Sequence, residues 1–111
     1  MPAIPPVGEL VAKMVGAAKA SLGRDWSKAR TFAEPELDRL ARSLVTIGQL
    51  AADGTINQQE AAALLDIHKN TTRMVILTVE GLGLLAVENA INAALGSVKD
   101  TLNTALGITL L

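Results

Sequence analysis

The fold is decided by residues 74–96, MVILTVEGLGLLAVENAINAALG, a stretch whose only charges are Glu80 and Glu88. No proline follows residue 35, so the pattern allows one very long helix from Asn57 onward. A helix that is apolar on nearly every side must be covered by other helices, by copies of itself or by lipid. The stretch therefore predicts an all-α helical bundle with one long C-terminal spine helix, completed by oligomerisation.

The composition also favours a helical, aliphatic core. Half of the 111 residues are hydrophobic, but the aromatic residues are only Trp26 and Phe32. Leu and Ala supply much of the apolar content, and both favour helices. Three of the four prolines lie in the first six residues. The sequence predicts a flexible proline-rich arm over residues 1–7 and a single helical domain over residues 8–111.

Apolar residues at helical spacing predict four to five helices in all. The first is expected over residues 8–22. Asp25 is expected to cap a short helix, and a new helix is expected over residues 35–52, because proline favours a first helical position. A single kinked helix over residues 24–52 is the alternative. The tail, residues 97–111, has the pattern of a short amphipathic helix.

The spine helix itself has two possible forms. A continuous helix over residues 57–96 would span about 60 Å. It would either bend near Gly81 and Gly83 or project and be covered by partner chains.

A helix–turn–helix joint is expected in DGTINQQE, residues 53–60. Its key residues are Asp53, Gly54, Asn57 and Glu60. The glycine supplies a positive φ, while the asparagine and the glutamate form a capping box for the next helix. The segment also resembles the second half of an EF-hand calcium loop. Two ligand positions of that loop would fall on Gln49 and Ala51, which provide no carboxylate, so the joint is the favoured interpretation.

Self-association is expected along the spine helix. Alanines that repeat every four residues allow two helices to approach closely, and aliphatic residues supply buried area. The residues expected at this contact are Leu82, Leu85, Ala86, Ala90, Ile91 and Ala94. The expected function is a non-enzymatic homo-oligomeric assembly or adaptor module, with the chain itself as partner in a homodimer or a higher oligomer.

A polar stripe interrupts the apolar helix at Lys69, Arg73, Glu80 and Glu88. It is either the solvent-facing side of the helix or the site of a glutamate buried between subunits. In the second case the glutamate would pair with Arg73 or with an arginine of the second helix and set the register.

Two other functions compete with assembly. A membrane-associated or pore-forming protein is possible, but the strongest apolar run, residues 74–87, is shorter than the roughly 20 residues of a spanning helix. A metal-binding bundle would need His68, Glu80 and Glu88 to meet across subunits. The chain has no Glu-x-x-His pair of the kind found in di-iron bundles, so no metal or cofactor is expected.

The remaining composition excludes several classes of function. The net charge is −1 without a basic block, so nucleic-acid binding is not expected. The chain has no cysteine, one histidine and four serines, and none of these serines has the flanking pattern of a nucleophile elbow. The N-terminal residues lack the pattern of a secretory signal, so a cytoplasmic location is expected.

Overall fold

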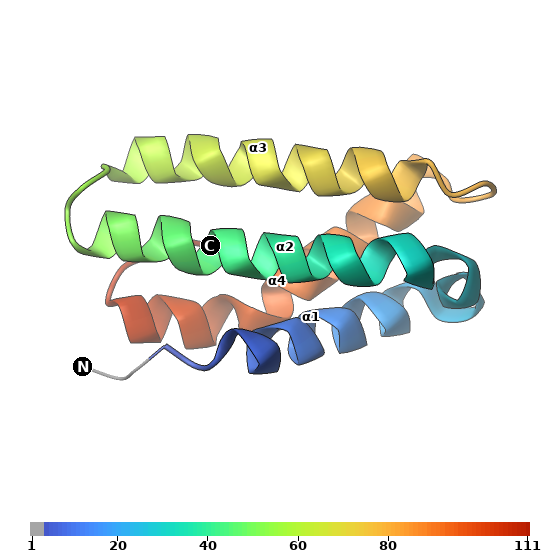
Figure 1. The fold of residues 1–111 in the computed structure, drawn as a ribbon, viewed down its shortest axis with the longest axis horizontal. Coiled ribbons are helices and arrows are strands. Elements are labelled where there is room, and N and C mark those ends of the chain that lie inside the picture. The colour runs from blue at the N-terminus through green and yellow to red at the C-terminus, as the bar shows by residue number, and fades with distance from the viewer. Residues whose placement is uncertain (1–3) are drawn as a thin grey trace.

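Within the described residues, the helical periodicity of the sequence is realised as four α-helices in succession. A computed structural model describes residues 4–111. The helices are α1 (Val7–Leu22), α2 (Trp26–Ala52), α3 (Gln58–Leu77) and α4 (Leu84–Leu106), and the 3-10 turn η1 (Gly23–Asp25) joins the first two (Figure 1). No strand occurs within the described range, so the all-α prediction is confirmed. Of the predicted flexible arm, residues 1–3 lie outside the described residues, while Ile4 and Val7 pack against the core.

The core is formed mainly by α1, α2 and α4, and the contact between α1 and α4 is the most extensive of the fold. Figure 1 shows α2 between α1 and α3, with α4 crossing behind. Within residues 4–111, α3 packs chiefly on α2 and does not touch α1. The buried residues of α1 are Leu10, Met14, Ala18 and Leu22, as the helical spacing predicts. Those of α4 are Val87, Ala90, Ile91, Ala94, Leu95, Val98, Leu102, Ala105 and Leu106. Consequently α3 is the least enclosed helix.

The predicted helix start at Pro35 is wrong, because α2 runs through this proline; the alternative of a single helix over residues 24–52 agrees with its course. Proline has no backbone N–H, so the carbonyl of Thr31 loses its helical partner. Both residues are exposed, so water can satisfy that carbonyl. The buried side chains of Ala33 and Leu37 continue the apolar stripe past the proline, and their packing maintains the helix.

The predicted spine helix is also wrong: α3 and α4 are separate helices joined by a loop of residues 78–83. Gly81 in this loop has φ +89°, which no α-helix contains. Val79 is buried and fixes the loop against the rest of the chain. An unbroken helix of about 60 Å would exceed the longest dimension of the fold, which is 42 Å. The chain therefore folds back at the glycines.

The tail is helical as far as Leu106, as predicted, but it does not form a separate helix. Residues 97–106 continue α4, which ends where Gly107 adopts φ +71°. The Asn103 side chain then accepts hydrogen bonds from the backbone N–H groups of Leu110 and Leu111. Gln58 Nε2 donates to the carbonyl of Thr109, which holds the tail against the start of α3.

The joint between α2 and α3 has the predicted form. Asn57 Oδ1 accepts from the backbone N–H of Glu60 at 2.8 Å, and Glu60 Oε1 accepts from the backbone N–H of Asn57 at 2.9 Å. These two bonds form the capping box. Gly54 has φ +83°, the left-handed conformation that the turn requires.

Gly54→Val should lower the free energy of unfolding by about 1 to 2 kcal/mol, because a left-handed conformation is strained for a residue with a Cβ. Gly96→Val is a matched control. Both glycines have open space where the Cβ would lie, but Gly96 is inside α4. We expect the control to change stability by less than about 0.5 kcal/mol. Denaturant unfolding followed by circular dichroism measures both, and equal effects would show that the turn does not depend on its glycine.

Candidate functional site

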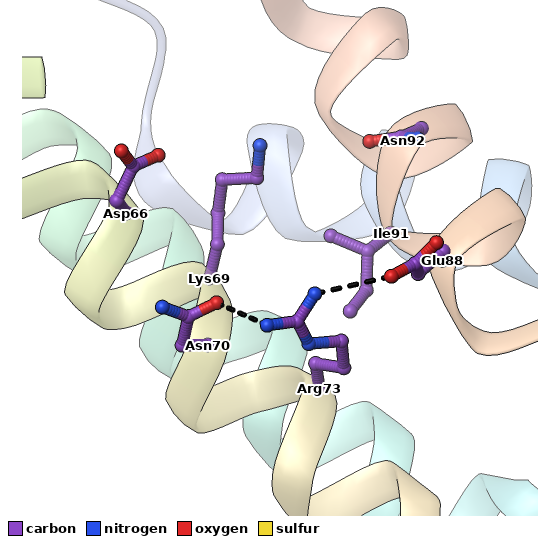
Figure 2. A pocket seen from close by; sticks show the side chains of 7 residues that line it. All are labelled: Asp66, Lys69, Asn70, Arg73, Glu88, Ile91 and Asn92. Carbon is purple, nitrogen blue, oxygen red and sulfur yellow. Dashed lines mark hydrogen bonds and ion pairs between the residues drawn. The ribbon is translucent and has the colours of Figure 1, made fainter. Parts of the chain in front are cut away.

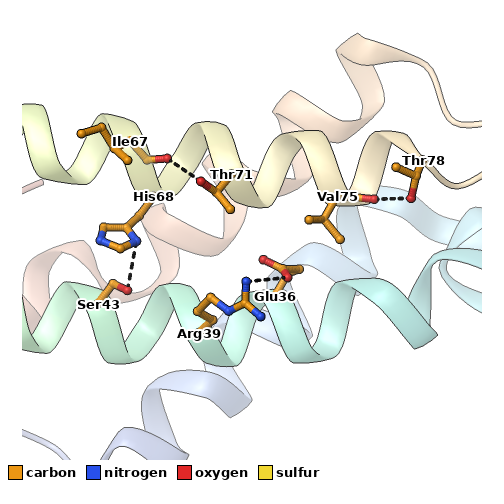
Figure 3. A network of polar contacts seen from close by, with 8 residues as sticks. All are labelled: Glu36, Arg39, Ser43, Ile67, His68, Thr71, Val75 and Thr78. Carbon is orange, nitrogen blue, oxygen red and sulfur yellow. Dashed lines mark hydrogen bonds and ion pairs between the residues drawn. The ribbon is translucent and has the colours of Figure 1, made fainter.

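One exposed side of α3 carries no charge along its middle, although the exposed Asp66 lies beside it. Helical spacing places five exposed residues on the side opposite the buried stripe of this helix. We define them as the α3 outer face: Ala63, Ile67, Asn70, Thr71 and Met74. Ile67 and Met74 are 58 % and 68 % exposed, which is high for large apolar side chains. Figure 3 shows that Ile67 points away from α2, whereas His68 points toward it.

The apolar surface recurs at the start of α4. Leu84 and Leu85 are 53 % and 72 % exposed and lie in the first turn after the loop. Phe32 on α2 is the remaining large hydrophobic side chain that is exposed within residues 4–111. Most of the exposed large apolar side chains thus belong to α3 and the first turn of α4.

The predicted self-association residues occupy different environments. Ala90, Ile91 and Ala94 are buried inside the chain, Leu82 and Ala86 pack partly buried against the core, and Leu85 is exposed. The alanine repeat therefore serves the core of a single chain in the structure. Sequence reasoning missed Ile67 and Met74, although their spacing of seven residues opposite the buried stripe was a usable signal.

A polar groove of about 300 Å³ separates α3 from α4 (Figure 2). Arg73 crosses it: Nη1 donates to Glu88 Oε1 at 3.1 Å, and Nη2 donates to Asn70 Oδ1. Lys69, Asp66 and Asn92 also line the groove, with Ile91 at its base. Arg73 therefore pairs with Glu88 of its own chain. The sequence left open an ion pair of this arginine with a glutamate of another subunit.

Polar contacts also occur between α2 and α3 and within α2 (Figure 3). Ser43 Oγ and His68 Nδ1 share a hydrogen bond of 3.3 Å. Glu36 of α2 is buried, with 5 % of its surface exposed. Its Oε1 forms an ion pair with Arg39 Nη1 at 3.2 Å. The other carboxylate oxygen, Oε2, has no hydrogen-bond partner among the described residues. This orphaned oxygen is an energetic cost inside the fold.

A depression of about 290 Å³ lies beside the hydrogen bond between Ser43 and His68. It is lined by Arg39, Arg42, Ser43, Thr46, Ile47 and His68. Both guanidinium groups already pair with carboxylates of α2, Arg39 with Glu36 and Arg42 with Asp38. The positive charge of this depression is therefore largely neutralised by neighbouring side chains.

The carboxylates of the predicted joint also have partners. Asp53 Oδ1 accepts from the Thr55 hydroxyl at 2.6 Å and from the Thr55 backbone N–H at 2.9 Å. Both hydrogen bonds lower the pKa of Asp53 from its ordinary value, and the bond from the Thr55 hydroxyl has the larger effect. Glu60 is engaged in the capping box. The arrangement is that of a structural turn.

The residues considered for metal binding lie in separate environments. His68 contacts Ser43, Glu88 pairs with Arg73, and Glu80 is exposed in the loop between α3 and α4. No cluster of three or more His, Cys, Asp or Glu side chains able to hold a metal occurs in the described part of one chain.

The lengths and hydropathies of the helices bear on the membrane alternative. None of the helices formed by residues 4–111 is both long and apolar enough to cross a bilayer.

Comparisons of the chain with protein-family models, with curated proteins and with solved structures gave no match.

Proposed function

We propose that the protein is a non-enzymatic helical assembly module of the cytoplasm that binds a second copy of itself, so that oligomerisation completes the bundle. The observation that supports this proposal is the position of the exposed large hydrophobic side chains. Ile67, Met74, Leu84 and Leu85 are on α3 and the first turn of α4, and the α3 outer face between the first two is uncharged. Exposed apolar surface of this kind marks sites of protein association.

The size of the surface suggests a dimer of moderate affinity. Each large aliphatic side chain that is fully buried contributes about 1.5 to 3 kcal/mol. Association costs about 4 to 15 kcal/mol in lost freedom of motion. Two such side chains from each copy contribute about 6 to 12 kcal/mol together. Even against the smallest association cost the net is at most about 8 kcal/mol, so the dissociation constant is expected between the micromolar and the millimolar range.

The mass of the protein in solution tests this function. Light scattering without detergent, over a series from micromolar to millimolar protein, should show a mass that rises from 11.6 kDa toward twice that value. The rise is expected because the apolar side chains are covered only in the dimer. A mass of one chain at every concentration would contradict the proposal. So would association that appears only in the presence of lipid vesicles.

A paired substitution locates the surface. Ile67→Glu combined with Met74→Glu should abolish the dimer, because four carboxylates would then meet in an apolar contact. Ala12→Glu combined with Ala20→Glu is the matched control: it adds the same charge at exposed positions of α1, a helix that does not contact α3 in the described structure. The control should keep the mass of the unmodified protein. A dimer that survives the α3 substitutions would rule out the α3 outer face.

A further inference from the structure

We infer that the two copies pack α3 against α3 in antiparallel orientation, about a two-fold axis that passes between Asn70 and Thr71. The inference rests on the proposed self-association and specifies its geometry. It follows from three properties of α3: the positions of its apolar residues, the order of its charges and the small uncharged residues between them.

The apolar residues fit such an axis. Ile67 and Met74 lie at equal distances along α3 on either side of the point between Asn70 and Thr71, and both are on the outer face. A two-fold axis at that point places Ile67 of each copy against Met74 of the other. The same contact then forms twice, as a closed symmetric dimer requires.

The charges of α3 distinguish antiparallel from parallel packing. The acidic residue Asp66 precedes the basic residues Lys69 and Arg73 along the helix. Antiparallel packing about this axis brings Asp66 of one copy toward the basic Arg73 of the other. Parallel packing in register would set each charge against its own copy, which is unfavourable.

The charged flank has the correct position for this pairing. Asp66, Lys69 and Arg73 all line the groove beside α4, so they lie on one side of the α3 outer face (Figure 2). In an antiparallel helix pair, equivalent flanks of the two helices meet. Asp66 of one copy would therefore lie near Arg73 of the other, at the edge of the apolar contact.

The centre of the contact is polar and small. Asn70 and Thr71 flank the axis, and the Thr71 hydroxyl already donates to the carbonyl of Ile67 at 3.0 Å. This hydroxyl can therefore be covered without losing a partner. Polar residues at the middle of a helix contact also fix its register, because a shift would place them against apolar side chains.

The absence of cysteine from the 111 residues makes the geometry directly testable by cross-linking. Ile67→Cys and Met74→Cys would be prepared as separate proteins, mixed and oxidised. A disulfide needs Cα atoms within about 7 Å. In the antiparallel dimer, position 67 of one copy lies opposite position 74 of the other. The two residues at position 67 are therefore separated by seven residues along the helix axes, which is about 10.5 Å.

The expected product is the mixed disulfide between Ile67→Cys and Met74→Cys, which intact mass distinguishes from either self-linked dimer. Each variant oxidised alone should remain unlinked. Ala20→Cys, at an exposed position of α1, measures random collision. Circular dichroism should show unchanged helix content, since all three positions are exposed.

The outcomes separate the two proposals. Self-linked dimers of each variant would indicate parallel packing and overturn the antiparallel arrangement. An unmodified protein that has the mass of a dimer but whose variants give no link above the Ala20→Cys background would also overturn it, while leaving self-association intact. An unmodified protein that is monomeric at all concentrations would overturn the proposed function itself.

Discussion

Ala90→Trp should lower the free energy of unfolding by about 3 kcal/mol or more, at the upper end of the cost of overpacking a core. Ala90 is buried on the α4 stripe that faces the rest of the chain, with 2 % of its surface exposed. An indole ring at this position would have to displace neighbouring core side chains. We expect a shifted denaturation midpoint or a chain that does not fold, as followed by helical circular dichroism.

Asn89→Trp is the control for this substitution, since it adds the same ring to the same helix at an exposed position. Its fold stability should change by less than about 0.5 kcal/mol. If Ala90→Trp instead kept the stability of the unmodified protein and only reduced its mass in solution, the alanine repeat of α4 would be an intersubunit contact after all.

Glu36→Met should raise the free energy of unfolding by about 2 kcal/mol. The glutamate is buried with one carboxylate oxygen unpartnered, and an unsatisfied buried polar group costs about 1 to 3 kcal/mol. Methionine has similar length and no such requirement. Arg39 is largely exposed, so it can be hydrated when its carboxylate partner is removed.

Glu34→Met provides the comparison. Glu34 also pairs with an arginine of α2, Arg30, at 3.2 Å, but its side chain is partly exposed. Loss of such a surface ion pair should change stability by less than about 1 kcal/mol. Thermal and denaturant unfolding of both variants would test the difference. A destabilised Glu36→Met protein would mean that the buried carboxylate has a stabilising partner.

Local signals predicted the parts of the fold that depend on neighbouring residues. The capping box at Asn57 and Glu60 and the turn at Gly54 require only a few consecutive residues, so their chemistry is visible in the sequence. The buried stripe of α1 was predictable for a similar reason, because polar residues mark its other faces.

The errors arose where distant contacts decide the outcome. An exposed proline costs a helix one hydrogen bond, and only the tertiary packing of Ala33 and Leu37 shows that α2 can continue. Residues 84–96 are apolar on most sides, so periodicity could not show which face α1 covers. The sequence therefore suggested an intersubunit role for Ala90 and Ala94, which the fold uses internally.

The extensive contact between α1 and α4 has a consequence for how the chain reaches its native state. During synthesis α1 leaves the ribosome first, and its buried residues Leu10 and Met14 lack their main cover until α2, α3 and α4 have followed. A helical protein closed by such distant segments folds more slowly than one built from neighbouring hairpins. The apolar stripe of α1 is therefore open to aggregation until α4 arrives, a risk that holdase chaperones reduce.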